Sequence, residues 1–535
     1  MRGEVTKIGA HFQKGGDVSL IRTSKTGFLR SISLFLSTEK FVDMNPRFFL
    51  LLALGFSLLG ASAQEQEKAV RTTFHTISSH DLLDYAAELS SPKYGGRLSG
   101  SPGYEAAARW VAGQLEEAGV KPGMGDGTYF QWFPNAYSDV LSPGKVVLLP
   151  GKQNARKRYH FPDDYFPGSN SASGTVSGEV VYAGFGISAP ELGYDDYHNL
   201  DVKGKIVLLE TGLPYNRNDS TLLKWEPYSY HRYKFSRARE LGAAGLLYVS
   251  KIANPNTSFL EGLVYAHISE AVAEELFDAT GKQYAETRAN IVKSLVPNSF
   301  RLNKRVKISA STKHYPDSRS CNVVGIIEGT DPQWKDEAIL VGAHLDGVGS
   351  PGSLFPGALD NASGSADILA AAKALAGSEI KPARTVIFLF FGGEECGLYG
   401  SQQFADAPVW PKEKVVCMIN LDMVGNGTGF FVSNGKTYQE LYRHFEEANN
   451  RFLHREMNAS ETRISYGRPR TDAAVFDKYG YKTLSLWTSG SVKPVYYHHP
   501  LDNTDALTPE IMEDAAKLLY LGILGIANDP ALKTN

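Results

Sequence analysis

The feature that most constrains this chain is a series of short apolar segments that alternate with helical patterns in its C-terminal half. The segments are rich in β-branched residues, as strands buried on both faces usually are. The alternation therefore predicts an α/β fold, with a mixed, largely parallel sheet covered by helices on both faces. The predicted strands are Val323–Ile327, Ala338–Gly342, Thr385–Phe391, Val415–Asn420 and Thr483–Trp487. The predicted helices are Ala362–Ala376, Tyr438–Asn449, Asp472–Tyr479 and Ile511–Ala527.

Acidic and imidazole side chains follow these predicted strands at the points where they end. Ligand sites in such sheets lie beyond the carboxyl ends of the strands, so we expect these side chains to gather at one edge. They are His344, Asp346, Asp360, Glu394, Glu395, Asp422, His498 and His499.

Each of these side chains has an ordinary explanation when it is taken alone, such as a helix cap, a buried histidine or a solvated glutamate. Together, however, five carboxylates at one sheet edge would repel one another strongly unless cations neutralised them. The short loops that carry the acids contain no Lys or Arg. We therefore predict one or two bound divalent metal ions. Imidazole and carboxylate without thiolate favour zinc in a catalytic site.

The N-terminal half divides into two parts. Helical spacing over Leu82–Leu89 and Tyr104–Ala118 flanks a glycine-rich loop, Gly95–Gly103, and from about residue 134 the pattern changes to short β-rich runs. We interpret residues 135–316 as an inserted region and residues 70–134 and 317–530 as the two parts of one discontinuous domain. The β-rich runs include Lys145–Leu149, Gly178–Tyr182, Lys205–Leu209 and Leu246–Val249, with one helix at Tyr233–Leu241.

The ordered motifs His344-Leu345-Asp346, Asp360-Asn361, Glu394-Glu395, Asp422 and His498 resemble the co-catalytic di-zinc aminopeptidases. That family also includes glutamate carboxypeptidase and the glutaminyl cyclases, and the Gly-Arg-Leu-x-Gly-Ser core of the early loop is similar to its early loop. The resemblance implies a zinc exopeptidase fold with two Zn²⁺ per chain. His344 and Asp422 would hold one ion, Glu395 and His498 the other, and Asp360 would bridge both.

The resemblance also implies roles for neighbouring residues. Glu394 would be the general base, and Asp346 would orient His344 through its second ring nitrogen. His498 is the expected ligand rather than His499, because His-x-Pro-x-Asp matches the family motif from the first histidine.

Three further positions follow from the same comparison of motifs. Asp502 would support the loop that carries His498, and the peptide bond from Asp360 to Asn361 would be cis. Tyr497 has two readings: it could donate a hydrogen bond to the developing oxyanion, or it could be an aromatic ring packed beside the ligand.

The inserted region has its own resemblance, to a protease-associated domain. The matching segments are Val180–Ile187, Tyr194–Tyr197 and Asp201–Val207. We expect a structural module packed on the catalytic domain. The alternative is that it forms part of the substrate cleft.

The substrate pocket is less defined. Where the family often has Ser-Asp-His, this chain has Thr471-Asp472-Ala473. Ser465–Arg470 precedes that motif and is predicted to line the pocket. Arg468 or Arg470 could engage a substrate carboxylate, although solvated surface is the expectation for both.

The predicted function is a secreted di-zinc aminopeptidase that acts on peptides with a free amino terminus. The alternatives are a carboxypeptidase or glutaminyl cyclase on the same fold, or a non-catalytic, receptor-like binding protein. With 55 Lys and Arg against 58 Asp and Glu, the charge is nearly balanced. A nucleic-acid partner is therefore not expected.

The first residues resemble an export signal. A basic segment at Met44–Arg47 precedes the apolar run Phe48–Leu59 and a small-x-small site at Ala61–Ala63, so residues 44–63 are predicted to be a signal peptide and 1–43 an upstream extension. The run is shorter than the roughly 20 residues of a spanning helix, and no stable membrane anchor is expected. The chain would be periplasmic or extracellular, where a pair among its three cysteines could bond.

Overall fold

The structure is a computed structural model that describes residues 64–152, 155–249, 253, 255, 258–463 and 465–534. The predicted upstream extension and signal peptide lie outside these residues. All the helices and strands named below belong to one compact unit, which begins at Lys68.

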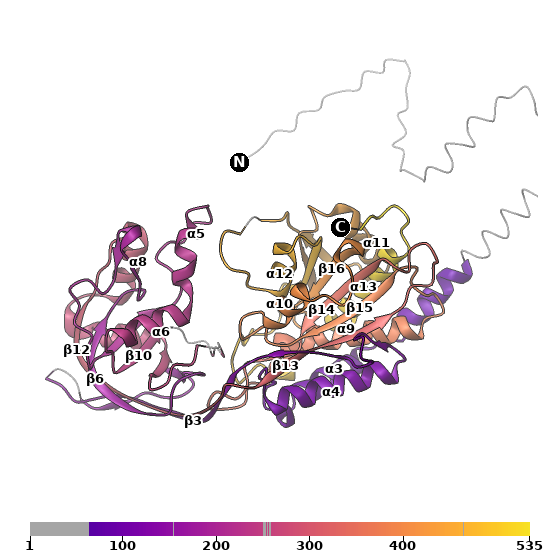
Figure 1. Cartoon of the computed structure of the whole chain (residues 1–535). Helices are drawn as coiled ribbons and strands as arrows, with labels where there is room; N and C mark the ends of the chain where they lie inside the picture. The colour runs from indigo at the N-terminus through magenta and orange to yellow at the C-terminus, as the bar shows by residue number, and fades with distance from the viewer. Residues whose placement is uncertain are drawn as a thin grey trace, which may run out of the picture. The chain divides into compact units, whose positions relative to one another are not determined.

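Within the described residues, a nine-stranded sheet is built from β1 and β2 and from the strands of the C-terminal half of the chain. Its strand order is β1-β13-β15-β14-β16-β19-β17-β18, with β2 paired to β13. The four central strands, β15, β14, β16 and β19, are mutually parallel, while β13 and β17 pair antiparallel with their ends of this block. The predicted mixed, largely parallel sheet is confirmed (Figure 1). Its strands are β1 (Lys121–Pro122), β2 (Phe130–Pro134), β13 (Arg319–Ile327), β14 (Ala338–His344), β15 (Thr385–Phe391), β16 (Val415–Leu421), β17 (Gly429–Ser433), β18 (Glu456–Ala459) and β19 (Thr483–Ser489).

Helices cover both faces of this sheet because alternate residues of its buried strands point to opposite sides. Ile339 and Val341 of β14 face a core shared with α3, α4, α9, α11 and α13, whereas Leu340 faces a smaller core shared with α10 and α12. Both layers are visible in Figure 1. The helices are α3 (Ser79–Leu89), α4 (Pro102–Glu117), α9 (Ser363–Gly377), α10 (Tyr399–Asp406), α11 (Gln439–Ala448), α12 (Asp472–Lys478) and α13 (Pro509–Ala527).

The residues between β2 and β13 build a second sheet of eight strands, in the order β4-β3-β12-β6-β9-β10-β11-β5. Its central strands β6, β9, β10 and β11 are parallel, and the long strands β3 and β12 pair antiparallel along most of their length. The strands are β3 (Tyr137–Leu148), β4 (Lys157–Arg158), β5 (Tyr165–Pro167), β6 (Gly174–Tyr182), β9 (Ile206–Glu210), β10 (Gly245–Val249), β11 (Val264–Ile268) and β12 (Phe300–Tyr315). A separate two-stranded ribbon joins β7 (Ser188–Ala189) and β8 (Tyr194–Asp195).

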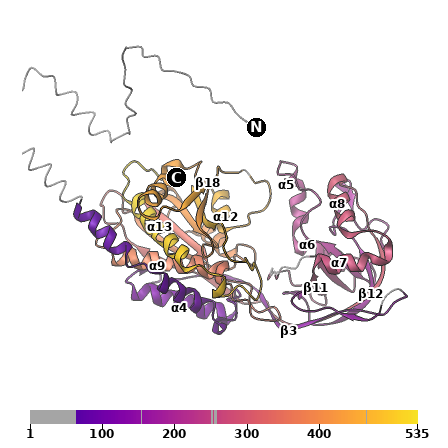
Figure 2. The same ribbon diagram turned by 180° about the vertical axis from the view of Figure 1, so that it is seen from behind.

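This second sheet also carries more helix than we predicted. Phe235 and Ala238 of α6 pack on one face, while α7 and α8 contribute Leu276 and Ile291 to the core on the other face (Figure 2). Only α6 was expected, although Ser269 accepts a hydrogen bond from Val272 N as a helix N-cap and was a readable signal for α7. The helices are α5 (Leu222–Trp225), α6 (His231–Glu240), α7 (Glu270–Phe277) and α8 (Tyr284–Ser294).

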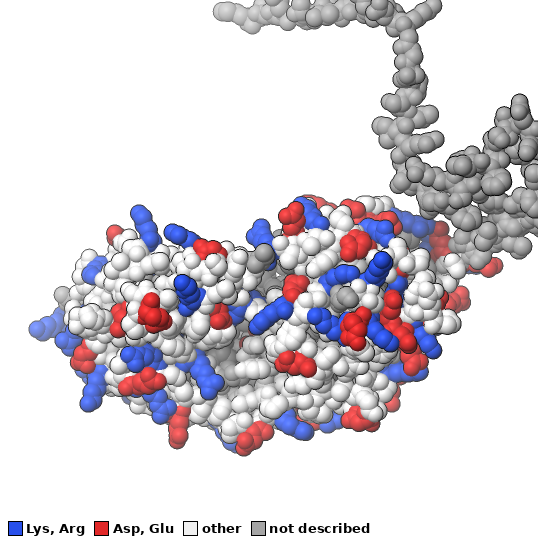
Figure 3. Space-filling view, turned by 45° about the horizontal axis from the view of Figure 1, so that its top comes forward, with Lys and Arg blue, Asp and Glu red and all other residues white. Residues whose placement is uncertain are grey.

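The charge distribution on the surface agrees with the sequence. Basic and acidic side chains are interspersed on the face shown in Figure 3, as the near-neutral charge implies. None of the helices in the described residues combines the length and the apolar character needed to cross a bilayer. The cysteines Cys321, Cys396 and Cys417 are all buried and all free, so no pair among them forms a disulfide.

Candidate metal centre

The side chains predicted from the strand ends come together at the carboxyl edge of the first sheet. Three groups place their ligand atoms within 4.8 Å of one another: His344 with Asp360 and Asp422, Asp360 with Glu395 and His498, and His344 with Glu394 and Glu395. His344 ends β14, Glu394 and Glu395 follow β15, and Asp422 follows β16. Parallel strands with a common direction therefore position residues that are far apart in the sequence.

Asp360 lies between the two histidines and presents one carboxylate oxygen to each. Its Oδ1 is 3.2 Å from His344 Nε2, and its Oδ2 is 3.4 Å from His498 Nε2. On the outer sides, Asp422 Oδ1 lies 3.5 Å from His344 Nε2 and Glu395 Oε2 lies 2.8 Å from His498 Nε2. This arrangement gives two half-sites, each with one imidazole and one carboxylate of its own, that share Asp360.

The donor set fits divalent metal ions. Imidazole and carboxylate are ligands that zinc accepts in open sites, and the residues of each half-site converge on one point. Asp422 Oδ1 is buried, and no group in the described part of the chain donates a hydrogen bond to it. A buried carboxylate oxygen without a donor is costly, and a cation would satisfy it.

The orientation of both imidazoles is fixed by backbone carbonyls. His344 Nδ1 is 3.2 Å from the carbonyl oxygen of Asp346, and His498 Nδ1 is 2.8 Å from that of Ala253. A carbonyl oxygen only accepts, so Nδ1 carries the hydrogen in both rings. In the neutral form of each ring, the lone pair is then on Nε2, the atom that faces the carboxylates.

Asp346 lies beside His344 and also beside the backbone of the two glutamates. Its carboxylate is 3.8 Å from His344 Nδ1, whereas it accepts hydrogen bonds from the backbone N–H groups of Glu394 (3.1 Å) and Glu395 (3.2 Å). It therefore positions the two glutamates, and its backbone carbonyl contacts the histidine. Full burial raises the pKa of Asp346 to about 7.

Glu394 lies within the third group but outside the two half-sites that share Asp360. Burial raises the pKa of its carboxyl group well above the usual range. The charge of His344 opposes this effect, and the neighbouring carboxylate of Glu395 adds to it. A carboxylate held beside the ligands without belonging to the shared pair is placed as a general base would be.

Tyr497 stacks on His498, with ring centroids 3.9 Å apart and planes 17° apart. Its residue is half exposed (49%), and burial of the hydroxyl raises its pKa above the usual value. The ring thus packs beside the candidate ligand, while its hydroxyl remains near the carboxylates.

The loop supports include one that we predicted and one that we missed. Asp502, in the loop that carries His498, accepts hydrogen bonds from the backbone N–H groups of Leu359 (2.9 Å) and Asp360 (3.1 Å), so it joins that loop to the one that carries Asp360. The bond between Asp360 and Asn361 is cis, as the resemblance implied. The missed residue is Arg97, which is fully buried. Its guanidinium donates to the carbonyl oxygens of Leu89, Leu345, Pro356 and Gly357.

Arg97 connects the glycine-rich loop to both ends of the loop between β14 and α9. Its partners there are Leu345, next to Asp346, and Pro356 and Gly357, which precede Asp360. Its positive charge interacts electrostatically with the carboxylates of Asp502, Asp346 and Asp360. Our prediction that metal ions neutralise the acids took account only of Lys and Arg within the short loops that carry those acids. The Gly-Arg-Leu-x-Gly-Ser motif was the available signal, but its arginine reaches the site from about 250 residues away in sequence.

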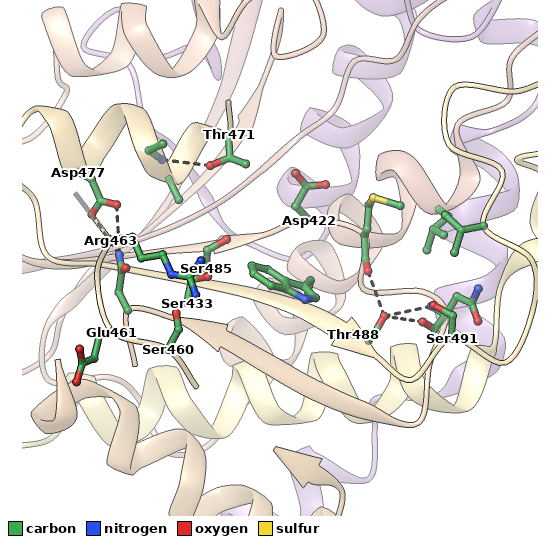
Figure 4. A pocket seen from close by; sticks show the side chains of 18 residues that line it. Asp422, Ser433, Ser460, Glu461, Arg463, Thr471, Asp477, Ser485, Thr488 and Ser491 are labelled. Atoms are coloured by element: carbon green, nitrogen blue, oxygen red, sulfur yellow. Dashed lines mark hydrogen bonds between the residues drawn. The ribbon is translucent and has the colours of Figure 1, made fainter. Parts of the chain in front are cut away.

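A cavity of about 530 Å³ opens beside Asp422. Thr471 and Ala473 line it, so the altered Thr-Asp-Ala motif does reach this pocket. Figure 4 shows Arg463 pointing toward Ser433 and Ser485, with Asp422 apart from them.

Our prediction that Ser465–Arg470 lines this pocket was wrong, because Ser460, Glu461 and Arg463 line it instead. The predicted segment turns toward the inserted region. The backbone N–H of Tyr466 donates to Asn218 Oδ1 (3.1 Å), and the Arg468 guanidinium lies 5.3 Å from the ring centre of Tyr230.

Two segments of the chain match known protein families. Residues 322–521 match peptidase family M28, and residues 176–276 match the PA domain. The first segment contains every candidate metal ligand, and the second lies in the sheet inserted before it.

Individual relatives point the same way. The chain is 25% identical to an aminopeptidase of Pseudomonas aeruginosa over 66% of its own length and 58% of the relative's. It is 30% identical to a probable leucine aminopeptidase of Arthroderma otae over 35% of its length and 54% of the relative's. The chain thus matches little more than half the length of these relatives. Its fold is that of the aminopeptidase from Aneurinibacillus sp. strain AM-1 (TM-score 0.58, 18% identity, covering 87% of this chain and 98% of that one).

Proposed function

We propose that this chain, a relative of peptidase family M28 with a PA domain inserted in it, is an exported di-zinc aminopeptidase. His344 and Asp422 would hold one zinc, Glu395 and His498 the other, and Asp360 would bridge them. The observation that carries the proposal is the position of Asp360, whose two carboxylate oxygens face the two imidazole Nε2 atoms separately.

When bound, a zinc pair supplies Lewis-acid polarisation of the scissile carbonyl and makes water easier to deprotonate at neutral pH. The residues of the chain supply the proton transfers. Glu394 would accept the proton of the attacking water on its carboxylate and return it to the nitrogen of the leaving amine. A positioned carboxylate of this kind contributes roughly 10²–10⁴-fold to the rate. Asp346 holds the backbone of Glu394 and Glu395 in place for this task.

The substrate's free amino terminus distinguishes this activity from others on the same fold. The test is hydrolysis of a panel of aminoacyl-p-nitroanilides beside their N-acetylated forms, with zinc-loaded protein that lacks residues 1–63. Cleavage of the free-amine set alone supports an aminopeptidase. Equal cleavage of both sets, or of neither while zinc is bound, contradicts it.

A carboxypeptidase is the second candidate, because Arg463 lines the cavity beside Asp422 and could bind a terminal carboxylate. N-blocked dipeptides with a free carboxyl group test this reading. It requires their cleavage, together with a rise in KM of about 10-fold or more in Arg463→Ala. Arg470→Ala, in the same segment but outside the cavity lining, is the matched control.

Export is also part of the proposal. Residues 44–63 have the order of a signal peptide, and the described helices include none that could anchor the chain across a bilayer. N-terminal sequencing of protein recovered outside the cytoplasm should begin at or near Gln64. Recovery of residues 1–43 on that protein would contradict the signal peptide.

A further inference from the structure

The hydrogen bond that orients His498 comes from the inserted region rather than from the peptidase domain. His498 Nδ1 donates to the carbonyl oxygen of Ala253 over 2.8 Å. On the opposite side of the ring, Nε2 faces Glu395 at 2.8 Å and Asp360 at 3.4 Å. The ring is therefore held between a carbonyl of one region and two carboxylates of the other.

The other imidazole of the centre does not depend on the inserted region. His344 ends β14, and its Nδ1 contacts the carbonyl of Asp346 in the loop that directly follows. The two half-sites thus have the same kind of support from different sources. The half-site of His344 is held by its own loop, and the half-site of His498 by a residue 245 positions away in the sequence.

Ala253 is itself held in place by apolar contacts across the two regions. It is fully buried in a cluster with Phe166, Val348 and Phe355. The rings of Phe166, from β5 of the inserted region, and Phe355 lie 5.7 Å apart. Val348 and Phe355 belong to the loop between Asp346 and Asp360, so the cluster joins the inserted region directly to the metal loop.

A second anchor lies two residues further on, at Pro255. The carbonyl oxygen of Pro255 accepts a hydrogen bond from Asn170 Nδ2 over 3.0 Å, and Asn170 Oδ1 accepts one from Ser138 Oγ over 2.6 Å. The backbone N–H of Asn170 donates to the hydroxyl of Tyr265. Asn170 itself is buried. It connects strands β3 and β11 to the segment that supports His498.

We propose that the inserted region completes one half of the metal centre, with Ala253 as the positioning residue for His498 and Asn170 as the residue that holds Ala253 in place. The identity of the bound ion rests on the proposed function, but the positioning of His498 does not. The inserted region would then be part of the site itself, whereas we expected only a structural module packed on the catalytic domain.

Zinc affinity tests this inference in the whole chain. Titration against a chromophoric chelator resolves two binding steps, and the step lost in His498→Gln identifies the half-site in question. Asn170→Ala and Ala253→Leu, which overfills the cluster, should each weaken that step about 10–100-fold, the usual cost of losing a supporting contact to a ligand, and leave the other step unchanged. Tyr284→Phe is the control. It removes a buried hydrogen bond to Glu210 inside the inserted region, away from His498, and should alter neither step.

A second measurement does not require zinc. In metal-free protein labelled with ¹⁵N-histidine, the Nδ1–H of His498 should exchange slowly with water, and Asn170→Ala should speed that exchange by about tenfold. Protection in the wild type and its loss in the variant support the positioning of His498, even if zinc fails to bind and the proposed function falls. Wild-type affinity for both zinc ions together with unchanged exchange in Asn170→Ala and Ala253→Leu would overturn the inference.

Discussion

The metal centre and the interior of the inserted region both bury carboxylates, but they satisfy them in different ways. In the inserted region, Glu210 accepts hydrogen bonds from the hydroxyl groups of Tyr182 (3.1 Å) and Tyr284 (2.9 Å), and Arg288 Nε lies 3.2 Å from the same carboxylate. Lys234 is buried beside it and donates to the carbonyl oxygen of Glu210. Every oxygen of this acid has a donor from the chain itself.

At the metal centre the carboxylates of Asp360, Glu395 and Asp422 face two imidazoles, and Asp422 Oδ1 has no donor among the described residues. Arg97 is buried nearby, but its guanidinium donates to backbone carbonyl oxygens rather than to these carboxylates. The comparison shows that buried acids alone do not mark a metal site. What marks it is a cluster of acids whose neighbours provide too few donors, so that a cation has to complete it.

The largest effect is expected for Asp360→Asn, which replaces the shared carboxylate with a neutral amide of the same size. Affinity for both zinc ions should fall by more than about 100-fold, because ligands count for more than the supporting contacts whose loss costs 10–100-fold, and activity should fall to background. Zinc content after dialysis, measured with kinetics, checks this. Asp477→Asn is the control, because that carboxylate interacts with Asn434 and Thr483. Retention of both ions in Asp360→Asn would show that Asp360 does not bridge.

Glu394→Gln should separate chemistry from metal binding within the same cluster. We expect both zinc ions to remain and kcat to fall by about 10²–10⁴-fold, because the amide cannot accept the proton of water. Metal analysis and kcat on the best aminoacyl substrate measure the two effects independently. Loss of one zinc would make Glu394 a ligand and would contradict its assignment as the base.

The sequence was sufficient to bring most of the candidate metal ligands together, because their positions follow from strand direction. Residues after β14, β15 and β16 must meet at one edge once those strands are parallel, so His344, Glu395 and Asp422 could be brought together without coordinates. Asp360 and His498 lie further along the loops that follow β14 and β19, and it was the family resemblance that gave them their roles as bridge and ligand.

Arg97 and Ala253 show what the sequence could not supply. The contacts of Arg97 run to carbonyls near residues 89, 345 and 356, and no local pattern encodes such distant partners. Ala253 contributes only a backbone carbonyl, so its side chain gives no chemical signal at all. The lining of the pocket was misjudged for a similar reason, because the contact between Tyr466 and Asn218 that turns Ser465–Arg470 away is between two regions.

Glu210→Gln makes the same kind of substitution, carboxylate to amide, in the self-satisfied network of the inserted region. It should lower the free energy of unfolding by about 1–3 kcal/mol, because charged hydrogen bonds from Tyr284 and Arg288 become weaker or unmade. Zinc content and kcat below the melting temperature should stay at wild-type values. Denaturant unfolding gives the first quantity. A loss of zinc equal to that of Asp360→Asn would erase the distinction between the two regions.

The smallest effect is a pH dependence within the inserted region. His267 is fully buried, neither ring nitrogen has a hydrogen-bond partner among the described residues, and burial lowers its pKa to about 4. Its neighbours are the rings of Tyr248 and Tyr265, with His231 close enough to Tyr248 to contact it.

Because the unfolded chain binds a proton at His267 near pH 6.5 and the folded chain only near pH 4, stability should fall as pH drops between these values. The loss is at most about 3.4 kcal/mol, because each unit between a pKa of 6.5 and about 4 corresponds to about 1.36 kcal/mol. His267→Phe keeps an aromatic ring and removes the titrating group, so it should flatten this part of the stability profile and leave pH 7 stability equal or higher. Urea unfolding of wild type and variant at pH 7 and pH 5 measures the difference. Parallel profiles would show that His267 does not cause the pH dependence. Its ring nitrogens would then have hydrogen-bond partners in the folded protein, as the carboxylate of Glu210 does.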